Sequence, residues 1–207
     1  MSPRNTQFSK EEIVAAAFEL AREQGWEGFS VQAVAKAINA STMPIYSHFA
    51  NIRELEDAVC RKALELLKKS LLVDRTGDVW IDQAISYVRF AMEEKYLYRC
   101  MWDGKNVELN RQMGKELVDF ISATLVDYPL FAGLDELEVR MIRVSRMMFA
   151  QKLAQWLNYD SDYLDSKGIF DMEDFIRRTS KALYDGFRMQ FQPRRVRDDS
   201  GETQPDI

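Results

Sequence analysis

The segment Ser30–Phe49, SVQAVAKAINASTMPIYSHF, is the part of this chain that most clearly predicts its fold. Apolar residues between Val31 and Ile38 follow the i, i+3, i+4, i+7 spacing of a helix with one buried face, and Ser30 stands before them as an N-cap. Asn39 is expected to end this helix, because asparagine tolerates the left-handed backbone found at helix ends. The segment therefore begins with a helix of about two turns.

A second helix is expected after a tight turn, with Ser41 as its predicted cap. Ile45 and Phe49 are its predicted inward-facing residues. Pro44 is compatible with the first turn, where the N–H that it lacks would have no partner. The remaining side chains are compact donors, acceptors and methyl groups, which suit base edges in a major groove. The competing interpretation is an ordinary packed helical corner.

Together with its flanks, this segment resembles the DNA-binding domain of the TetR family of bacterial transcriptional regulators. The similar pieces are IVAAAFELAREQG, FSVQAVAKAINAS and IYSHFANIREL, which cover roughly the first quarter of the chain. The resemblance implies a three-helix unit with a helix-turn-helix. The residues expected to contact DNA are Gln32, Lys36, Ser41, Thr42, Met43, Pro44, Tyr46, Ser47, His48 and Arg53.

Two features of this region are unusual for a DNA-binding domain of the family. Ile52 stands where the family usually has a lysine that meets a DNA phosphate, and Arg53 replaces it only in part; Asn39 stands where glycine is common. The chain has a net charge of -5, and residues 1–53 hold five basic and five acidic residues. A neutral domain predicts weak nonspecific affinity for DNA with a shallow salt dependence.

The composition, with 46% hydrophobic and 29% charged residues, is ordinary for a globular protein. No apolar run approaches the ~18 residues of a membrane span, and the N-terminus lacks the apolar core of a signal peptide. We therefore expect a cytoplasmic, nucleoid-associated protein with no membrane partner. Cys60 and Cys100 belong to no CxxC motif, and His48 is the only histidine, so we expect no metal and no cofactor.

Each cysteine is expected to be a small buried hydrophobe, and no disulfide is expected. Glycine-rich phosphate loops and nucleophile motifs are missing from the sequence, so an enzyme is not expected.

The predicted architecture is all-α: a helix-turn-helix DNA-binding domain over residues 1–53, a larger helical effector-binding and dimerisation domain over residues 54–192, and a disordered tail over residues 193–207. A capping box of Ser9 and Glu12 is expected to start the first helix. Asn51 is expected to cap a long helix, which in the family links the two domains. The tail is predicted from its scarcity of apolar residues.

Aromatic and methionine residues are dense between Ile81 and Trp156, which suits an adaptable apolar cavity, although any helical core contains the same residues. The family usually binds a small-molecule effector in this domain. The predicted pocket residues are Tyr87, Phe90, Tyr98, Met101, Trp102, Phe120 and Met148. The candidates for an acidic ligand are Arg89, Arg99, Arg143 and Arg146, and the sequence does not choose among them.

The last two long helices of the family pack against their copies in a second subunit, which implies a two-fold homodimer here. The predicted interface residues are Phe175, Ile176, Thr179, Leu183, Gly186 and Phe187. The competing interpretation is that these helices only complete the core of the monomer.

The expected function is that of a DNA-binding transcriptional regulator, a homodimeric repressor that an unidentified small-molecule effector releases from a double-stranded DNA operator. The effector would act by favouring a dimer shape that does not fit DNA. The alternative is a helical adaptor, a protein-binding module with weak or lost DNA binding. Ile52 and the neutral first domain keep this alternative open.

Overall fold

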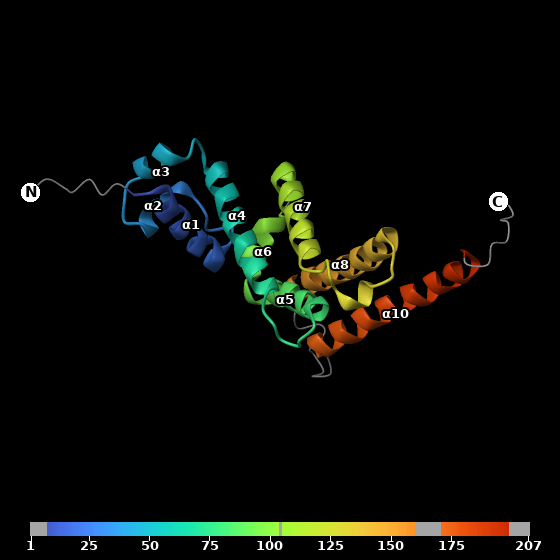
Figure 1. The fold of residues 1–207 in the computed structure, drawn as a ribbon. Helices are drawn as coiled ribbons and strands as arrows, with labels where there is room; N and C mark the ends of the chain where they lie inside the picture. Colours follow the sequence, from blue (N-terminus) through green and yellow to red (C-terminus); the bar gives the residue numbers. More distant parts are fainter. Residues whose placement is uncertain (1–7, 104, 160–170, 199–207) are drawn as a thin grey trace, which may run out of the picture. The chain divides into compact units, whose positions relative to one another are not determined.

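The computed structural model describes residues 8–103, 105–159 and 171–198 of the 207-residue chain, and within these ranges it is built of helices without strands (Figure 1). The predicted all-α class is confirmed. Two compact units make up the chain: unit 1 comprises residues 1–72 and 89–123, and unit 2 comprises residues 73–88 and 124–207. The predicted domain boundary between residues 53 and 54 stays a prediction, since compact packing groups the first helices with several later ones.

Unit 1 begins with α1 (Lys10–Gln24), α2 (Val31–Ala37) and α3 (Met43–His48). The hydroxyl of Ser9 accepts from the N–H of Glu12, and the Glu12 carboxylate accepts from the N–H of Ser9, so the predicted capping box is confirmed. The hydroxyl of Ser30 accepts from the N–H of Ala33 and caps α2, also as predicted. Gly25 ends α1 with a φ of 65°, a backbone region that favours glycine.

The turn between α2 and α3 depends on Asn39, whose φ of 53° is left-handed, as predicted. The prediction that Ser41 caps α3 was wrong, because Thr42 occupies the N-cap position and its side chain makes no capping hydrogen bond with any described residue. The reason is local. Pro44, three residues after Ser41, has no N–H from which the Ser41 hydroxyl could accept, and the N–H of Ile45 donates to the Thr42 carbonyl.

Helices α4 (Ile52–Leu71), α6 (Lys95–Trp102) and α7 (Val107–Ala123) complete the core of unit 1. Asn51 caps α4 by accepting from the N–H of Glu54, which confirms the predicted cap. Helix α4 is central to this core, because it packs against α1, α6 and α7. Its buried face consists of Leu55, Val59, Cys60, Ala63, Leu64, Leu67 and Leu71. The helix-turn-helix therefore shares a hydrophobic core with the later helices of unit 1.

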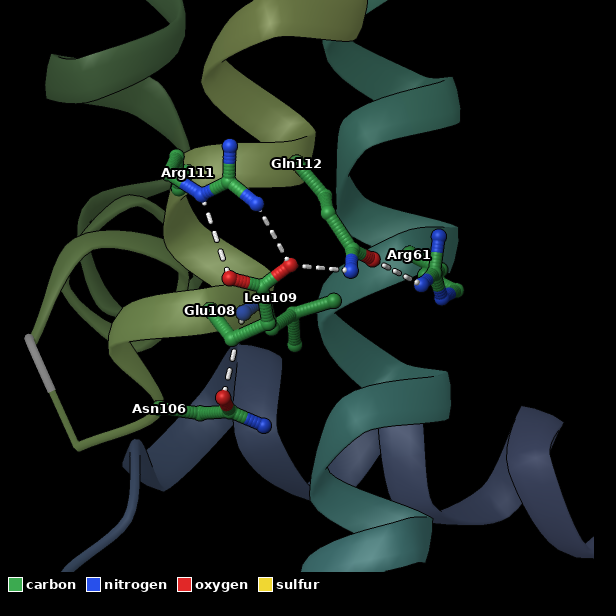
Figure 2. A network of polar contacts seen from close by, with 6 residues as sticks. All are labelled: Arg61, Asn106, Glu108, Leu109, Arg111 and Gln112. Carbon is green, nitrogen blue, oxygen red and sulfur yellow. Dashed lines mark hydrogen bonds and ion pairs between the residues drawn. The ribbon is translucent and has the colours of Figure 1, made fainter.

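A polar network holds the beginning of α7 against α4, and Figure 2 shows part of it. Asn106 accepts from the N–H of Leu109 at 3.1 Å, and its side-chain amide donates to both carboxylate oxygens of Asp57 at 3.0 Å. Nearby, Gln112 accepts from the guanidinium of Arg61 at 3.1 Å. Two residues of α4 therefore fix the N-terminal turns of α7.

Replacing Asn106 with alanine is expected to lower the free energy of unfolding by about 2 kcal/mol, because it removes both a helix cap and a hydrogen bond to a carboxylate, each worth about 1 kcal/mol. Asn106→Ser keeps a capping oxygen but loses the donor to Asp57, so its free energy of unfolding should lie between those of the wild type and Asn106→Ala. Urea unfolding followed by circular dichroism measures these differences. Lys115→Ala, at an exposed position of α7, is the control; if Asn106→Ala were as stable as this control, the network would contribute nothing.

Unit 2 contains the first ten residues of α5 (Val79–Glu93), the short helix η1 (Pro129–Phe131), α8 (Glu136–Tyr159) and α10 (Met172–Asp198). Helices α8 and α10 pack side by side (Figure 1). The carboxylate of Asp78 caps α5 and that of Asp171 caps α10. None of the described helices combines the length and the apolar character needed to cross a bilayer.

The end of α10 overlaps the segment that the sequence analysis assigned to a disordered tail. Residues 193–198 belong to the helix. The rest of that segment, residues 199–207, lies outside the described residues.

Candidate nucleic-acid interface

The position of α3 is set by two buried side chains. Ile45 is 1% exposed and Phe49, directly after the helix, is 2% exposed, so both predicted inward-facing residues are confirmed. A helix of six residues has too few internal hydrogen bonds to be stable alone, so these anchors hold it in place. They pack in the unit whose core includes Ile13 of α1 and Val34 of α2, both fully buried.

The opposite face of α3 points to solvent. Met43 is 77% exposed and Tyr46 is 56% exposed. The exposed members of the predicted DNA-binding set are Gln32, Lys36, Ser41, Met43, Tyr46, Ser47 and Arg53. The half-buried members are Thr42, Pro44 and His48. The surface that α2, the turn and α3 present is therefore open for contact with another molecule.

Two of the expected DNA-contacting side chains have partners of their own. Nε2 of His48 donates to the carbonyl oxygen of Phe8 at 2.9 Å and ties the segment before α1 to the end of α3. The hydroxyl of Ser47 donates to the carbonyl of Pro44 at 2.7 Å. A hydroxyl that donates once still accepts, so Ser47 retains acceptor capacity. His48 has a structural role that the sequence did not reveal, because its partner lies forty residues away.

The charge near this face comes from few residues. Lys36 in the last turn of α2 and Arg53 in the first turn of α4 are both exposed. Arg22, by contrast, forms an ion pair with Glu94, and the hydrogen bond to that carboxylate raises the pKa of Arg22. Ile52, at the position of the family's phosphate-binding lysine, is half-buried. Lys36 and Arg53 therefore remain the predicted phosphate contacts of this face.

A cleft of about 20 Å³ lies in unit 1 beside the first turns of α4, with Arg53, Glu56 and both cysteines among its lining residues. This volume accommodates a water molecule but no effector, since small-molecule sites measure several hundred Å³. None of the seven described residues that we predicted for the effector pocket lines it. Among the described residues, no group of three or more His, Cys, Asp or Glu side chains is arranged to hold a metal ion.

Both cysteines are buried, and Sγ of Cys60 donates to the carbonyl of Cys100 at 3.5 Å. Burial raises the pKa of both thiols, that of Cys100 to about 12. Because the thiolate is the reactive form, roughly one molecule in ten thousand is reactive at Cys100 near pH 8. We expect native protein to resist iodoacetamide at that pH and denatured protein to be alkylated at both positions, as mass spectrometry will show. Rapid alkylation of the native protein would contradict this expectation.

The residues predicted for the effector pocket belong to both compact units. Phe90, Tyr98, Met101, Trp102 and Phe120 lie in unit 1, whereas Tyr87 and Met148 lie in unit 2. Trp102 and Phe120 are half-buried and Met148 is 62% exposed, while the other four are buried. The effector pocket stays a prediction, and Met148 lies on the surface of unit 2.

Helix α8 exposes an apolar stripe. Its members follow the i, i+4, i+7, i+11 spacing of one helix face and are Leu137, Met141, Val144 and Met148, with exposed fractions of 61%, 41%, 40% and 62%. On the neighbouring α10, Phe175 is 40% exposed, Gly186 is exposed, and Thr179, Leu183 and Phe187 are half-buried. Ile176 is fully buried within the subunit, so we assign it to the core of unit 2 and leave it out of the candidate dimer face.

Comparison with known proteins agrees with this geometry. Residues 13–59 match the family model described as "Bacterial regulatory proteins, tetR family". No curated protein matches the sequence. Among solved structures, the TetR family transcriptional regulator PfmR from Thermus thermophilus is 20% identical, with a TM-score of 0.51 over 83% of this chain and 96% of that chain.

A TetR variant from Acinetobacter baumannii AYE, solved in complex with minocycline, is 16% identical, with a TM-score of 0.47 over 90% of this chain and 97% of that chain. The match of residues 13–59 to the family model confirms the resemblance to the TetR family for the N-terminal region. The fold, a helix-turn-helix domain followed by a larger helical part, is that of a TetR-family regulator.

Proposed function

We propose that this chain, whose N-terminal region is a TetR-family DNA-binding domain, is a homodimeric repressor that a small-molecule effector releases from its operator. The observation that carries the proposal is the two-sided character of α3. Ile45 and Phe49 fix the helix from within, while Met43 and Tyr46 project into solvent. A helix held in this way can enter a major groove and present side chains to base edges without unfolding its own domain.

The apolar stripe on α8 supports the dimer. Monomeric proteins rarely leave a row of large apolar side chains uncovered along a helix, and a second copy would cover it. Two-fold packing of α8 and α10 with their copies makes a four-helix interface. A dimer in turn presents two copies of α3, as recognition of two half-sites about one helical turn apart requires.

Gel-shift titration with the DNA upstream of the chain's own gene tests the proposal, with unrelated DNA of equal length as competitor. We expect a discrete complex that survives excess competitor and contains two protein chains. A reporter gene under that upstream DNA should be expressed less when the protein is present. If the protein bound neither the upstream DNA nor the unrelated DNA at any salt concentration, the result would favour the alternative function, a helical adaptor that binds other proteins.

A further inference from the structure

Unit 2 contains a buried guanidinium with incomplete hydrogen bonding. Arg146 of α8 is 3% exposed, and its guanidinium carbon lies 4.0 Å from the centre of the Trp80 ring. Nη1 donates to the carbonyl oxygen of Trp80 at 2.7 Å, and Nη2 lies 3.5 Å from Oε1 of Gln83. Nε has no hydrogen-bond partner among the described residues.

Within the part of the chain that the structure describes, the charge of Arg146 also lacks a directly paired anion. No described carboxylate forms an ion pair with it, and Asp78 attracts it only through longer-range Coulomb interaction. The Asp78 carboxylate is already occupied, because it accepts from the N–H of Trp80 and from the hydroxyl of Tyr128. Half-buried Arg143 adds a second positive charge, and burial lowers the pKa of both arginines, that of Arg146 to about 10.

An unpaired cation at a buried position lowers the stability of the fold, because the charge loses its hydration. An apolar side chain of similar size at the same position is often neutral or stabilising. A bound anion would supply both the missing charge and an acceptor for Nε. Four arginines are candidates from the sequence for binding an acidic ligand, and Arg146 is the only one of these four that is buried. Arg89, for example, is half-buried and pairs with Glu93.

We infer that Arg146 anchors the carboxylate group of a small, largely apolar effector, an inference that rests on the proposed function of a ligand-responsive regulator. A guanidinium presents two parallel N–H groups along one edge, which matches the two oxygens of a carboxylate. Trp80 lies against the guanidinium, and the centre of the Phe131 ring lies 5.4 Å from that of Trp80. Such aromatic side chains suit a ligand with an apolar body.

The test measures thermal unfolding of the full-length protein without DNA, in a buffer free of carboxylate and phosphate. The probes are benzoate and octanoate, each paired with its neutral amide, benzamide or octanamide. We expect at least one acid to raise the unfolding midpoint in a concentration-dependent manner, by about 3 °C at ten times its dissociation constant, and its amide to have no comparable effect. Equal effects of acid and amide on the wild-type protein would overturn the inference.

Substitutions identify the anchor. Arg146→Met should abolish the acid-dependent shift, and Arg146→Lys, which keeps the charge but loses the two-pronged geometry, should weaken apparent affinity at least tenfold. Arg140→Met removes the same charge from an exposed position of α8 and should respond like the wild type. A full acid response in Arg146→Met would overturn the inference; if that variant does not fold, a wild-type response in Arg146→Lys would do so.

Because this readout contains no DNA, its failure is distinct from failure of the regulator itself. Gel shift of the free protein tests DNA binding independently of any ligand. A chain that binds its upstream DNA but shows no acid-specific stabilisation would keep the proposed function and lose the carboxylate site.

Discussion

Replacing Tyr46 with alanine is expected to weaken operator binding by about 1–3 kcal/mol, a roughly five- to 150-fold increase in Kd. Tyr46 is 56% exposed on the solvent face of α3, so its ring and hydroxyl are placed to meet a groove rather than to stabilise the domain. Fluorescence anisotropy with labelled operator DNA at one fixed salt concentration measures the change. Tyr46→Phe keeps the ring and separates the contribution of the hydroxyl.

Tyr96→Ala is the matched control, since Tyr96 is 42% exposed and lies on α6 in the same unit, away from α2 and α3 in the chain. Its operator affinity should equal that of the wild type. The melting temperature of Tyr46→Ala should also be unchanged, because the anchors Ile45 and Phe49 are intact. If Tyr46→Ala bound operator as tightly as the wild type, Tyr46 would not belong to the DNA-reading surface.

The double substitution Val144→Glu with Met148→Glu is expected to convert the proposed dimer to monomers at micromolar concentration. In a two-fold interface it places four carboxylates in an apolar contact, and each unpaired buried charge costs several kcal/mol. Operator affinity should fall at least a hundredfold, because a monomer engages one half-site and loses the advantage of two linked contacts. Analytical ultracentrifugation and anisotropy measure the two effects.

Val118→Glu provides the control for this experiment. Val118 of α7 is 39% exposed, against 40% for Val144, but lies outside the α8 stripe. It should remain dimeric and bind operator normally. Circular dichroism of the double variant should show native helix content, because both replaced side chains already face solvent in the subunit. A double variant that still sediments as a dimer would place the interface elsewhere.

The first helices were predictable from sequence because their signals are local. The capping residues Ser9, Ser30 and Asn51 act within three residues of themselves, and Asn39 ends α2 through its own backbone preference. The predicted cap of α3 was wrong, and the cause is again a nearby residue. The proline at its second position removes the donor that Ser41 was expected to bind.

Contacts between residues far apart in the sequence could not be predicted from the sequence. Periodicity shows that α8 and α10 carry apolar residues but not which of them the other helix covers, so Ile176 was grouped with the exposed Phe175. The bond from His48 to Phe8 and the stacking of Arg146 on Trp80 join residues far apart in sequence. The choice of one arginine among four therefore required the tertiary structure.

The separation of anchoring and exposed side chains in α3 bears on how a DNA-binding protein of this kind could acquire new DNA target sequences. Since the side chains that anchor this short segment and those that face outward lie on opposite sides, substitutions at Met43 and Tyr46 should cost little folding stability. Under the proposed function, a lineage could exchange its recognised base pairs through a few point substitutions without loss of folding stability. The same property makes these positions natural choices for a randomised library aimed at redirected promoters.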